Sequence, residues 1–187
     1  KESRGEYLAR FDCDDISLPK RFEEQVKFLD TNAKVGMVSL WADVIDGNWK
    51  YLRSIKYPTT DKYLRKVLIQ YNPFFHPGLM IRKSAILDAG LYDENWIFAQ
   101  DYELYFRIAK KWKLANVPEI LLKYRETGDS ITADKNRKQV GFVLSAKLKA
   151  LREGQYSKWN YIHLLRSYIS WVFPISLKRL VKKFIVG

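Results

Sequence analysis

The stretch Gly5-Glu6-Tyr7-Leu8-Ala9-Arg10-Phe11-Asp12-Cys13-Asp14-Asp15 predicts a short strand that ends in an acidic turn. Positions 7–11 are mostly apolar, which is typical of a strand that is buried on both faces. The three carboxylates that follow are like charges held this close and repel one another, so their closeness costs free energy that a divalent cation would remove. Mg²⁺ and Mn²⁺ prefer such oxygen ligands. The alternative is a solvated acidic turn that caps the next helix.

The residues after the turn predict a helix. Pro19 suits its first turn, and we expect Ser17 or Asp15 to cap it, with an end near Asn32. An apolar stripe is expected on its buried face, made of Phe22, Val26 and Leu29. Taken together, the run from Gly5 to Arg21 resembles the metal-binding segment of family 2 glycosyltransferases, which have a GT-A fold. In that family a D-x-D motif closes a central strand.

The resemblance implies a nucleotide-diphosphate sugar as donor, with a UDP-sugar as the expected form, and Mn²⁺ or Mg²⁺ as cofactor. It places Asp14 and Asp12 on the metal, and Asp12, Asp14 and Asp15 in donor binding. Asp12 is alternatively a contact to the nucleotide ribose or the sugar, and Asp15 a supporting residue or a helix cap. Cys13 is interpreted as a small spacer, because one thiolate among hard oxygen ligands makes a poor site.

A second segment of the same family resembles Asn72-Pro73-Phe74-Phe75-His76-Pro77, which precedes a short apolar strand and Arg82-Lys83-Ser84. In the family this segment lies beside the acceptor, which implies an acceptor-side role for His76. A lone histidine in a loop bounded by prolines is otherwise typical of a structural hydrogen-bonding group.

A third segment begins the predicted helix from Gln100 to Trp112. Helix dipoles favour an acid in the first turn, so capping alone would account for Asp101. The family has Glu-Asp here and uses the Asp as catalytic base, which implies that role for Asp101 and leaves Gln100 on the acceptor side. Residues 114–124 resemble the family's closing strand, and Arg125 is assigned to the acceptor side. Relatives often have a His where this chain has Thr127.

The composition is strongly basic, with 33 Lys and Arg against 21 Asp and Glu and a net charge of +12. Such a surface suits anionic partners. Nucleic acid is not expected among them, because the sequence has no zinc-ligand pairs and no aromatic RNA-binding strand signature. The single cysteine excludes an internal disulfide and fits a reducing compartment. The polar start shows no signal peptide, so we expect a cytoplasmic protein.

From about Asp134 the chain changes to basic amphipathic helices, expected around 140–151, 158–172 and 175–186. No uninterrupted apolar run is long enough to span a bilayer. Basic and aromatic residues alternate over 158–187, which is typical of interfacial helices and predicts contact with a membrane surface, at the inner face of the plasma membrane. Packing against the catalytic domain or a second subunit is the alternative.

These observations predict an α/β fold, the C-terminal portion of a Rossmann-like GT-A domain with a mixed sheet over 1–131, followed by a helical tail over 132–187. The family's nucleotide-binding strands are expected upstream of Lys1. The resemblance implies metal-dependent, inverting sugar transfer to the hydroxyl of a glycan or lipid-linked acceptor, in bacterial-type cell-surface polysaccharide or glycan synthesis. The alternatives are a catalytically inactive relative that binds sugar nucleotides and a basic nucleic-acid-binding protein.

Overall fold

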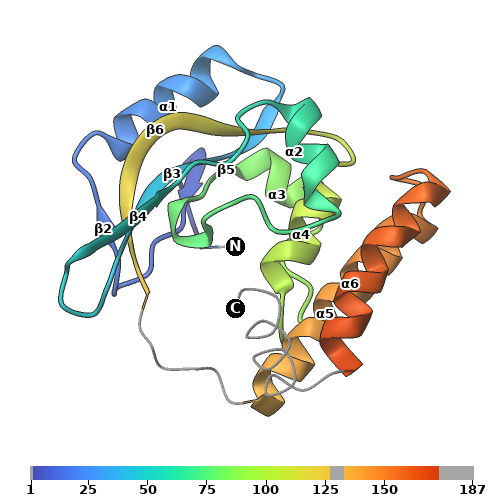
Figure 1. Cartoon of the computed structure of the whole chain (residues 1–187). Coiled ribbons are helices and arrows are strands. Elements are labelled where there is room, and N and C mark those ends of the chain that lie inside the picture. Colours follow the sequence, from blue (N-terminus) through green and yellow to red (C-terminus); the bar gives the residue numbers. More distant parts are fainter. Residues whose placement is uncertain (1, 127–132, 173–187) are drawn as a thin grey trace. The chain divides into compact units, whose positions relative to one another are not determined.

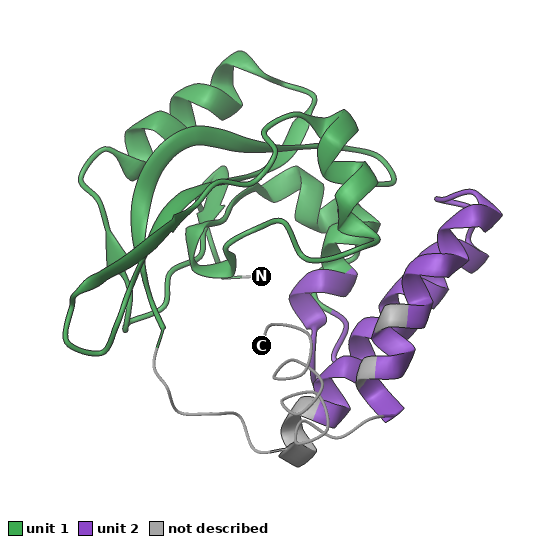
Figure 2. Cartoon of the chain, in the orientation of Figure 1, with its two compact units in different colours: residues 1–92, 104–129 green, residues 93–103, 130–187 purple. Residues whose placement is uncertain are grey.

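The structure, a computed structural model, describes residues 2–126 and 133–172 (Figure 1). They divide into two compact units, one of residues 1–92 and 104–129 and one of residues 93–103 and 130–187 (Figure 2). The helix expected over 175–186 lies outside the described residues, as does Thr127. The domain boundary between 131 and 132 stays a prediction.

Within the described residues, the first unit contains a six-stranded mixed sheet. Only β3 and β6 run parallel, and the other pairings are antiparallel. The strand order is β1 (Tyr7–Ala9), β5 (Met80–Arg82), β3 (Val35–Ile45), β6 (Lys113–Arg125) and β2 (Ile16–Ser17), with β4 (Tyr51–Ile55) as a hairpin partner of β3. This arrangement confirms the predicted α/β class with a mixed sheet.

The centre of the sheet is formed by the two long strands β3 and β6. Most of β3 is buried, as its nearly continuous apolar run predicts for a strand covered on both faces. Its side chains form one core with Leu29, Phe75 and Leu122. Helices α1 (Arg21–Thr31), α2 (Asp61–Leu68) and α3 (Lys83–Asp88) pack against these strands. The core therefore holds the two central strands of the sheet together with the helices that cover them.

Two expectations about the first strand and helix are wrong. β1 is only partly buried, because it lies at an edge of the sheet and pairs with β5 alone among the described strands. α1 begins at Arg21 after Lys20 and has no side-chain cap. Neither predicted cap is available, because β2 holds Ser17 against β6 and the carboxylate of Asp15 is hydrogen-bonded to β6.

The buried face of α1 also differs from the expected apolar stripe. Arg21, Gln25 and Leu29 are fully buried, whereas Phe22 is 49% exposed. Residues four apart share a helix face, so these three buried residues form a stripe as regular as the predicted one. The buried stripe is displaced around the helix from the predicted stripe by about one residue. The predicted end near Asn32 is confirmed, since Asn32 is the C-cap. In contrast, α4 (Gln100–Ile108) ends before the predicted Trp112.

The second unit is helical in its described part. α5 (Ala133–Arg152) is followed by the 3₁₀ turn η2 (Lys158–Tyr161) and by α6 (Ile162–Val172), in agreement with the two helices expected there. α5 ends at Arg152 and is followed by Gly154, whose φ of +74° allows the amides of Gly154 and Gln155 to bond back to the carbonyls of Leu151 and Ala150. No helix within residues 2–126 and 133–172 is long and apolar enough to cross a membrane.

Candidate donor and metal site

The acidic turn stands where β1 leaves the edge of the sheet. The amide of Asp15 donates to the carbonyl of Asp12 at 3.2 Å, so the chain turns tightly at these positions. Cys13 and Asp14 are exposed, and Asp12 is partly exposed. The guanidinium of Arg10 pairs with Asp12, at 2.6 Å between Nη2 and Oδ1. Two carboxylates are therefore offered to solvent within one turn.

The third carboxylate of the turn has a different environment. Asp15 is 7% exposed, and its Oδ1 accepts the backbone N–H of Arg125 at 2.8 Å. Its Oδ2 is buried and has no hydrogen-bond partner in the structure. Burial raises the pKa of Asp15, and the nearby charges of Asp14 and Asp12 raise it further. Asp15 thus fastens the turn to the end of β6 and keeps one oxygen unsatisfied.

Arg125 lies beside Asp15 rather than apart from the acidic turn. Its guanidinium stacks on the indole of Trp49, with the carbon Cζ 3.5 Å from the ring centroid. Its Nε is buried without a hydrogen-bond partner. The structure therefore brings Arg125, which was expected on the acceptor side, together with Asp15, which was expected to bind the donor.

His76 is joined to the same turn through Arg10. The Nε of Arg10 donates to Nε2 of His76 at 3.0 Å, and Nδ1 of His76 lies 3.0 Å from the hydroxyl of Tyr105. Arginine carries only donors, so Nε2 accepts, and in the neutral ring Nδ1 holds the proton and donates to Tyr105. The neighbouring Phe75 packs on Tyr124 of β6, with ring centroids 5.5 Å apart. Arg10 thus connects Asp12 with His76.

Arg21 is a residue of this region that the sequence reasoning missed. It is fully buried, and its Nη2 donates to the carbonyl of Arg10 at 2.6 Å and to that of Leu79 at 3.3 Å. Burial lowers its pKa to about 10, while the charge of Asp15 acts in the opposite direction. The signal was present in the spacing of Arg21, Gln25 and Leu29, which places an arginine on the buried face of α1.

Gln100 and Asp101 belong to the second unit and begin α4. The helix follows Ala99, which has a left-handed φ of +52° and whose carbonyl accepts the amide of Glu103 at 3.1 Å. Gln100 is exposed and Asp101 is half-buried. The buried Glu103 accepts a charged hydrogen bond from Lys149 of α5 at 2.7 Å. This bond anchors the first turn of α4 to α5.

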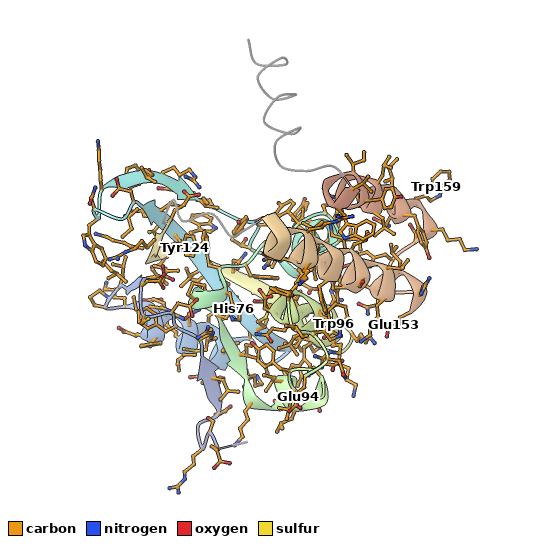
Figure 3. The ribbon with its side chains drawn as sticks, turned by 90° about the horizontal axis from the view of Figure 1, so that it is seen from below. His76, Glu94, Trp96, Tyr124, Glu153 and Trp159 are labelled. Atoms are coloured by element: carbon orange, nitrogen blue, oxygen red, sulfur yellow. The ribbon has the colours of Figure 1, made fainter. Side chains whose placement is uncertain are left out.

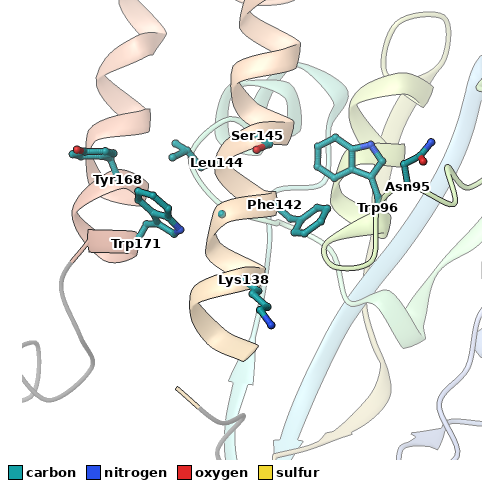
Figure 4. A pocket seen from close by; sticks show the side chains of 9 residues that line it. Asn95, Trp96, Lys138, Phe142, Leu144, Ser145, Tyr168 and Trp171 are labelled. Carbon is teal, nitrogen blue, oxygen red and sulfur yellow. The ribbon is translucent and has the colours of Figure 1, made fainter. Parts of the chain in front are cut away.

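The segment before Asp101 is also anchored to α5. The rings of Trp96 and Phe142 meet edge to face with centroids 5.6 Å apart. A cavity of about 520 Å³ lies beside them, between this segment and helices α5 and α6 (Figure 4). Its lining is mainly aromatic and apolar and includes Asn95, Trp96, Lys138, Phe142, Tyr168 and Trp171. Asp101 therefore stands on a segment that is fixed both before and after it.

The acidic turn fits a hard cation that has few protein ligands. Asp12 and Asp14 supply exposed carboxylate oxygens, and Oδ2 of Asp15 is a buried oxygen without a partner. Within the described part of the chain, no group of three or more His, Cys, Asp and Glu side chains is arranged to hold a metal alone. Mg²⁺ and Mn²⁺ commonly take only one or two carboxylates and complete their shell with phosphates and water.

Known proteins resemble this chain over the same region. The family described as glycosyltransferase-like family 2 matches residues 1–153. An uncharacterized glycosyltransferase of Methanocaldococcus jannaschii is 39% identical over 126 residues, which cover 66% of this chain and 43% of the relative. The O-antigen biosynthesis glycosyltransferase WbnJ of Escherichia coli is 36% identical over 123 residues, covering 63% of this chain and 46% of the relative. The chain thus spans less than half the length of these two relatives.

The fold has a counterpart among solved structures. The mannosyltransferase PcManGT from Pyrobaculum calidifontis, in complex with GDP-Man and Mn²⁺, superposes with a TM-score of 0.54 at 15% identity. The match covers 98% of this chain and 56% of that one. It confirms the predicted GT-A type of fold. With the family match over most of its length, this chain belongs to glycosyltransferase-like family 2.

Proposed function

We propose that this chain forms the diphosphate-binding and acceptor-activating part of an inverting glycosyltransferase. The observation that carries the proposal is the acidic turn, in which Asp12 and Asp14 are open to solvent while Asp15 keeps an unsatisfied buried oxygen. The donor class is a nucleotide-diphosphate sugar, with a UDP-sugar as the expected form. Support for the class comes from PcManGT, whose structure contains GDP-Man and Mn²⁺.

Asp14 and Asp12 would hold Mn²⁺ or Mg²⁺ through their carboxylate oxygens. When bound, such a cation supplies Lewis-acid chemistry, which stabilises negative charge on a departing diphosphate. Arg10 is ion-paired with Asp12, and Arg125 orients Asp15 through its backbone N–H. Arg21 stabilises the turn by donating a hydrogen bond to the carbonyl of Arg10.

Asp101 would take the proton from the acceptor hydroxyl as that oxygen attacks the anomeric carbon of the sugar. The bond from the anomeric carbon to the diphosphate oxygen breaks on the opposite side, so the configuration at that carbon inverts. Asp101 stands in the first turn of α4, which the Glu103–Lys149 bond and the Trp96–Phe142 contact hold in place. His76 and Gln100 are proposed on the acceptor side. The acceptor class is a glycan or lipid-linked hydroxyl in polysaccharide synthesis, as the name of WbnJ suggests.

The donor half is tested by titrating UDP into the chain with and without Mn²⁺. Binding should need Mn²⁺ and should be weakened by Asp14→Asn, because the variant removes one anionic ligand oxygen. Glu119→Gln, which removes an exposed carboxylate from β6, is the matched control and should bind as the parent chain does. Binding that ignores both Mn²⁺ and Asp14→Asn would refute the donor site.

The acceptor half is tested by sugar transfer with Asp101→Asn in the longest natural chain that contains this segment. A positioned general base contributes about 10²–10⁴-fold, so the variant should lose about that factor in rate while UDP binding persists. Transfer at the parental rate would exclude Asp101 as the base.

A binding-only protein is the second candidate function, and Gln100 in place of the family's Glu favours it. In that case the parent chain would bind UDP and Mn²⁺ without turnover.

A further inference from the structure

The outer face of α6 is apolar, although it faces solvent. Its exposed fractions are 68% for Ile162, 55% for Leu165, 45% for Ile169 and 42% for Val172. Tyr161, at 42% exposed, and Tyr168, at 52%, lie next to this stripe. Trp159 of the preceding turn is 89% exposed (Figure 3). We call these seven residues, Trp159, Tyr161, Ile162, Leu165, Tyr168, Ile169 and Val172, the α6 outer face; Tyr168 lies at its edge, where it also lines the cavity beside α5.

Helical geometry makes this a single surface rather than a scatter of side chains. At about 100° per residue, the positions from 161 to 172 in this set fall within an arc of about 120°. The opposite face of the helix carries Ser167, which is 9% exposed and accepts a hydrogen bond from Nζ of Lys147 in α5 at 3.0 Å. A polar residue thus faces inward and apolar residues face outward, the reverse of the usual pattern for a helix surrounded by water.

Positive charge accompanies this surface. Residues 130–187 contain twelve of the 33 basic residues and only two of the 21 acidic ones, so they carry nearly all of the net charge of +12. Lys158 is exposed beside Trp159, and Arg137 of α5 stacks over Trp171 at 5.3 Å from the ring centroid. An apolar face with exposed aromatic rings and Lys158 beside it, on a strongly basic segment, is complementary to a bilayer surface that contains anionic lipid.

We propose that the α6 outer face docks on an anionic lipid bilayer, with α6 lying in the interface. The helix has 11 residues, too few to span the hydrocarbon core, but enough to place one apolar face among the acyl chains. The sequence predicted membrane contact somewhere in 158–187, and this proposal assigns it to the α6 outer face. Docking needs neither metal nor sugar nucleotide, so its failure would leave the proposed transfer reaction untouched.

The test measures binding of the chain to vesicles of phosphatidylcholine mixed with phosphatidylglycerol and to vesicles of phosphatidylcholine alone. The variant is Leu165→Ser/Ile169→Ser. The matched control is Leu87→Ser/Leu52→Ser, because these residues are exposed to nearly the same extent, 53% and 44%, in the first unit. Circular dichroism checks that both variants fold, as substitutions of exposed side chains should allow.

We expect the chain to bind the anionic vesicles, with an affinity that falls as salt is added. The α6 variant should lose about 10- to 100-fold in vesicle affinity, because two half-exposed aliphatic side chains no longer enter the bilayer. The control variant should bind like the parent chain.

Three results would overturn the proposal. One is vesicle binding that the α6 variant leaves unchanged. This includes the case in which vesicle binding is abolished only by removing residues 173–187. Another is equal binding to neutral vesicles. The third is a dimer in sedimentation that the α6 variant dissociates without any loss of lipid binding, which would assign the face to a second copy of the chain.

Discussion

Gly36 in β3 provides a stringent test of how the central sheet is packed. A Cβ atom on Gly36 would lie 2.6 Å from Cβ of Trp112, 2.8 Å from Cγ of Trp112 and 2.7 Å from Cβ of Ala85. Carbon atoms pack best at about 3.5–4.0 Å, so the substitution Gly36→Ala requires a shift of about 1 Å. No rotamer change relieves it, because two of the three atoms are Cβ atoms fixed by the backbone. The indole N–H of Trp112 is also bonded to Asp88 at 2.9 Å.

The cost follows from these contacts. Overpacking of a well-packed core typically costs about 1–3 kcal/mol, and two overlaps with Cβ atoms fixed by the backbone place Gly36→Ala near the upper end. The gain from a less flexible unfolded chain, about 0.4–1 kcal/mol, offsets part of it. We therefore expect a net loss of about 2–3 kcal/mol in the free energy of unfolding. For a chain of this size, that corresponds to a fall in Tm of about 4–12 °C.

Gly47→Ala is the control, because a Cβ atom there would meet nothing within 4 Å. Thermal and urea unfolding followed by circular dichroism compare the two variants with the parent chain. Hydrogen exchange of the peptide 35–45 reports on β3 itself, which matters because two compact units need not unfold together. The packing argument is refuted if Gly36→Ala matches Gly47→Ala in both Tm and β3 protection.

Two further predictions concern the acidic turn. Asp15→Asn keeps the acceptor for the Arg125 N–H and removes a carboxylate whose pKa is raised mainly by burial. Because the pKa of Asp15 is higher in the folded than in the unfolded chain, the parent chain loses stability as the pH rises through the folded pKa. The variant lacks this group and should therefore be the more stable protein at neutral pH. The difference in unfolding free energy should shrink as the solution is acidified below the folded pKa. Urea unfolding between acid and neutral pH measures this difference in stability. A difference that does not change with pH would contradict the raised pKa of Asp15 as its cause. Arg10→Gln removes the cation paired with Asp12 and should tighten Mn²⁺ binding about 2- to 5-fold in calorimetry, since exposed pairs contribute about 0.2–1 kcal/mol. Weaker binding would mean that Arg10 positions Asp12 for the metal.

The sequence by itself determined the elements and the family. β3 was predictable because its long apolar run is recognisable without knowledge of its neighbours, and β6 because residues 114–124 resemble the family's closing strand. The acidic turn, the His76 loop and the start of α4 were identified from local residue order, which the chain carries in any conformation. The resemblance to family 2 glycosyltransferases depended on that order alone, and the family match over residues 1–153 confirms it.

Only the tertiary structure decided which of these residues meet. The contacts between Asp15 and Arg125 and between Arg10 and His76 join positions 110 and 66 residues apart, which no local pattern specifies. The same holds for Arg21, whose buried guanidinium donates hydrogen bonds to the carbonyls of Arg10 and Leu79. On α6, periodicity revealed an amphipathic helix, but only the fold shows that the face with Ser167 packs on α5, where Lys147 donates to its hydroxyl. Local order selects the conformation of a segment, whereas burial and pairing depend on distant segments that only the folded chain brings together.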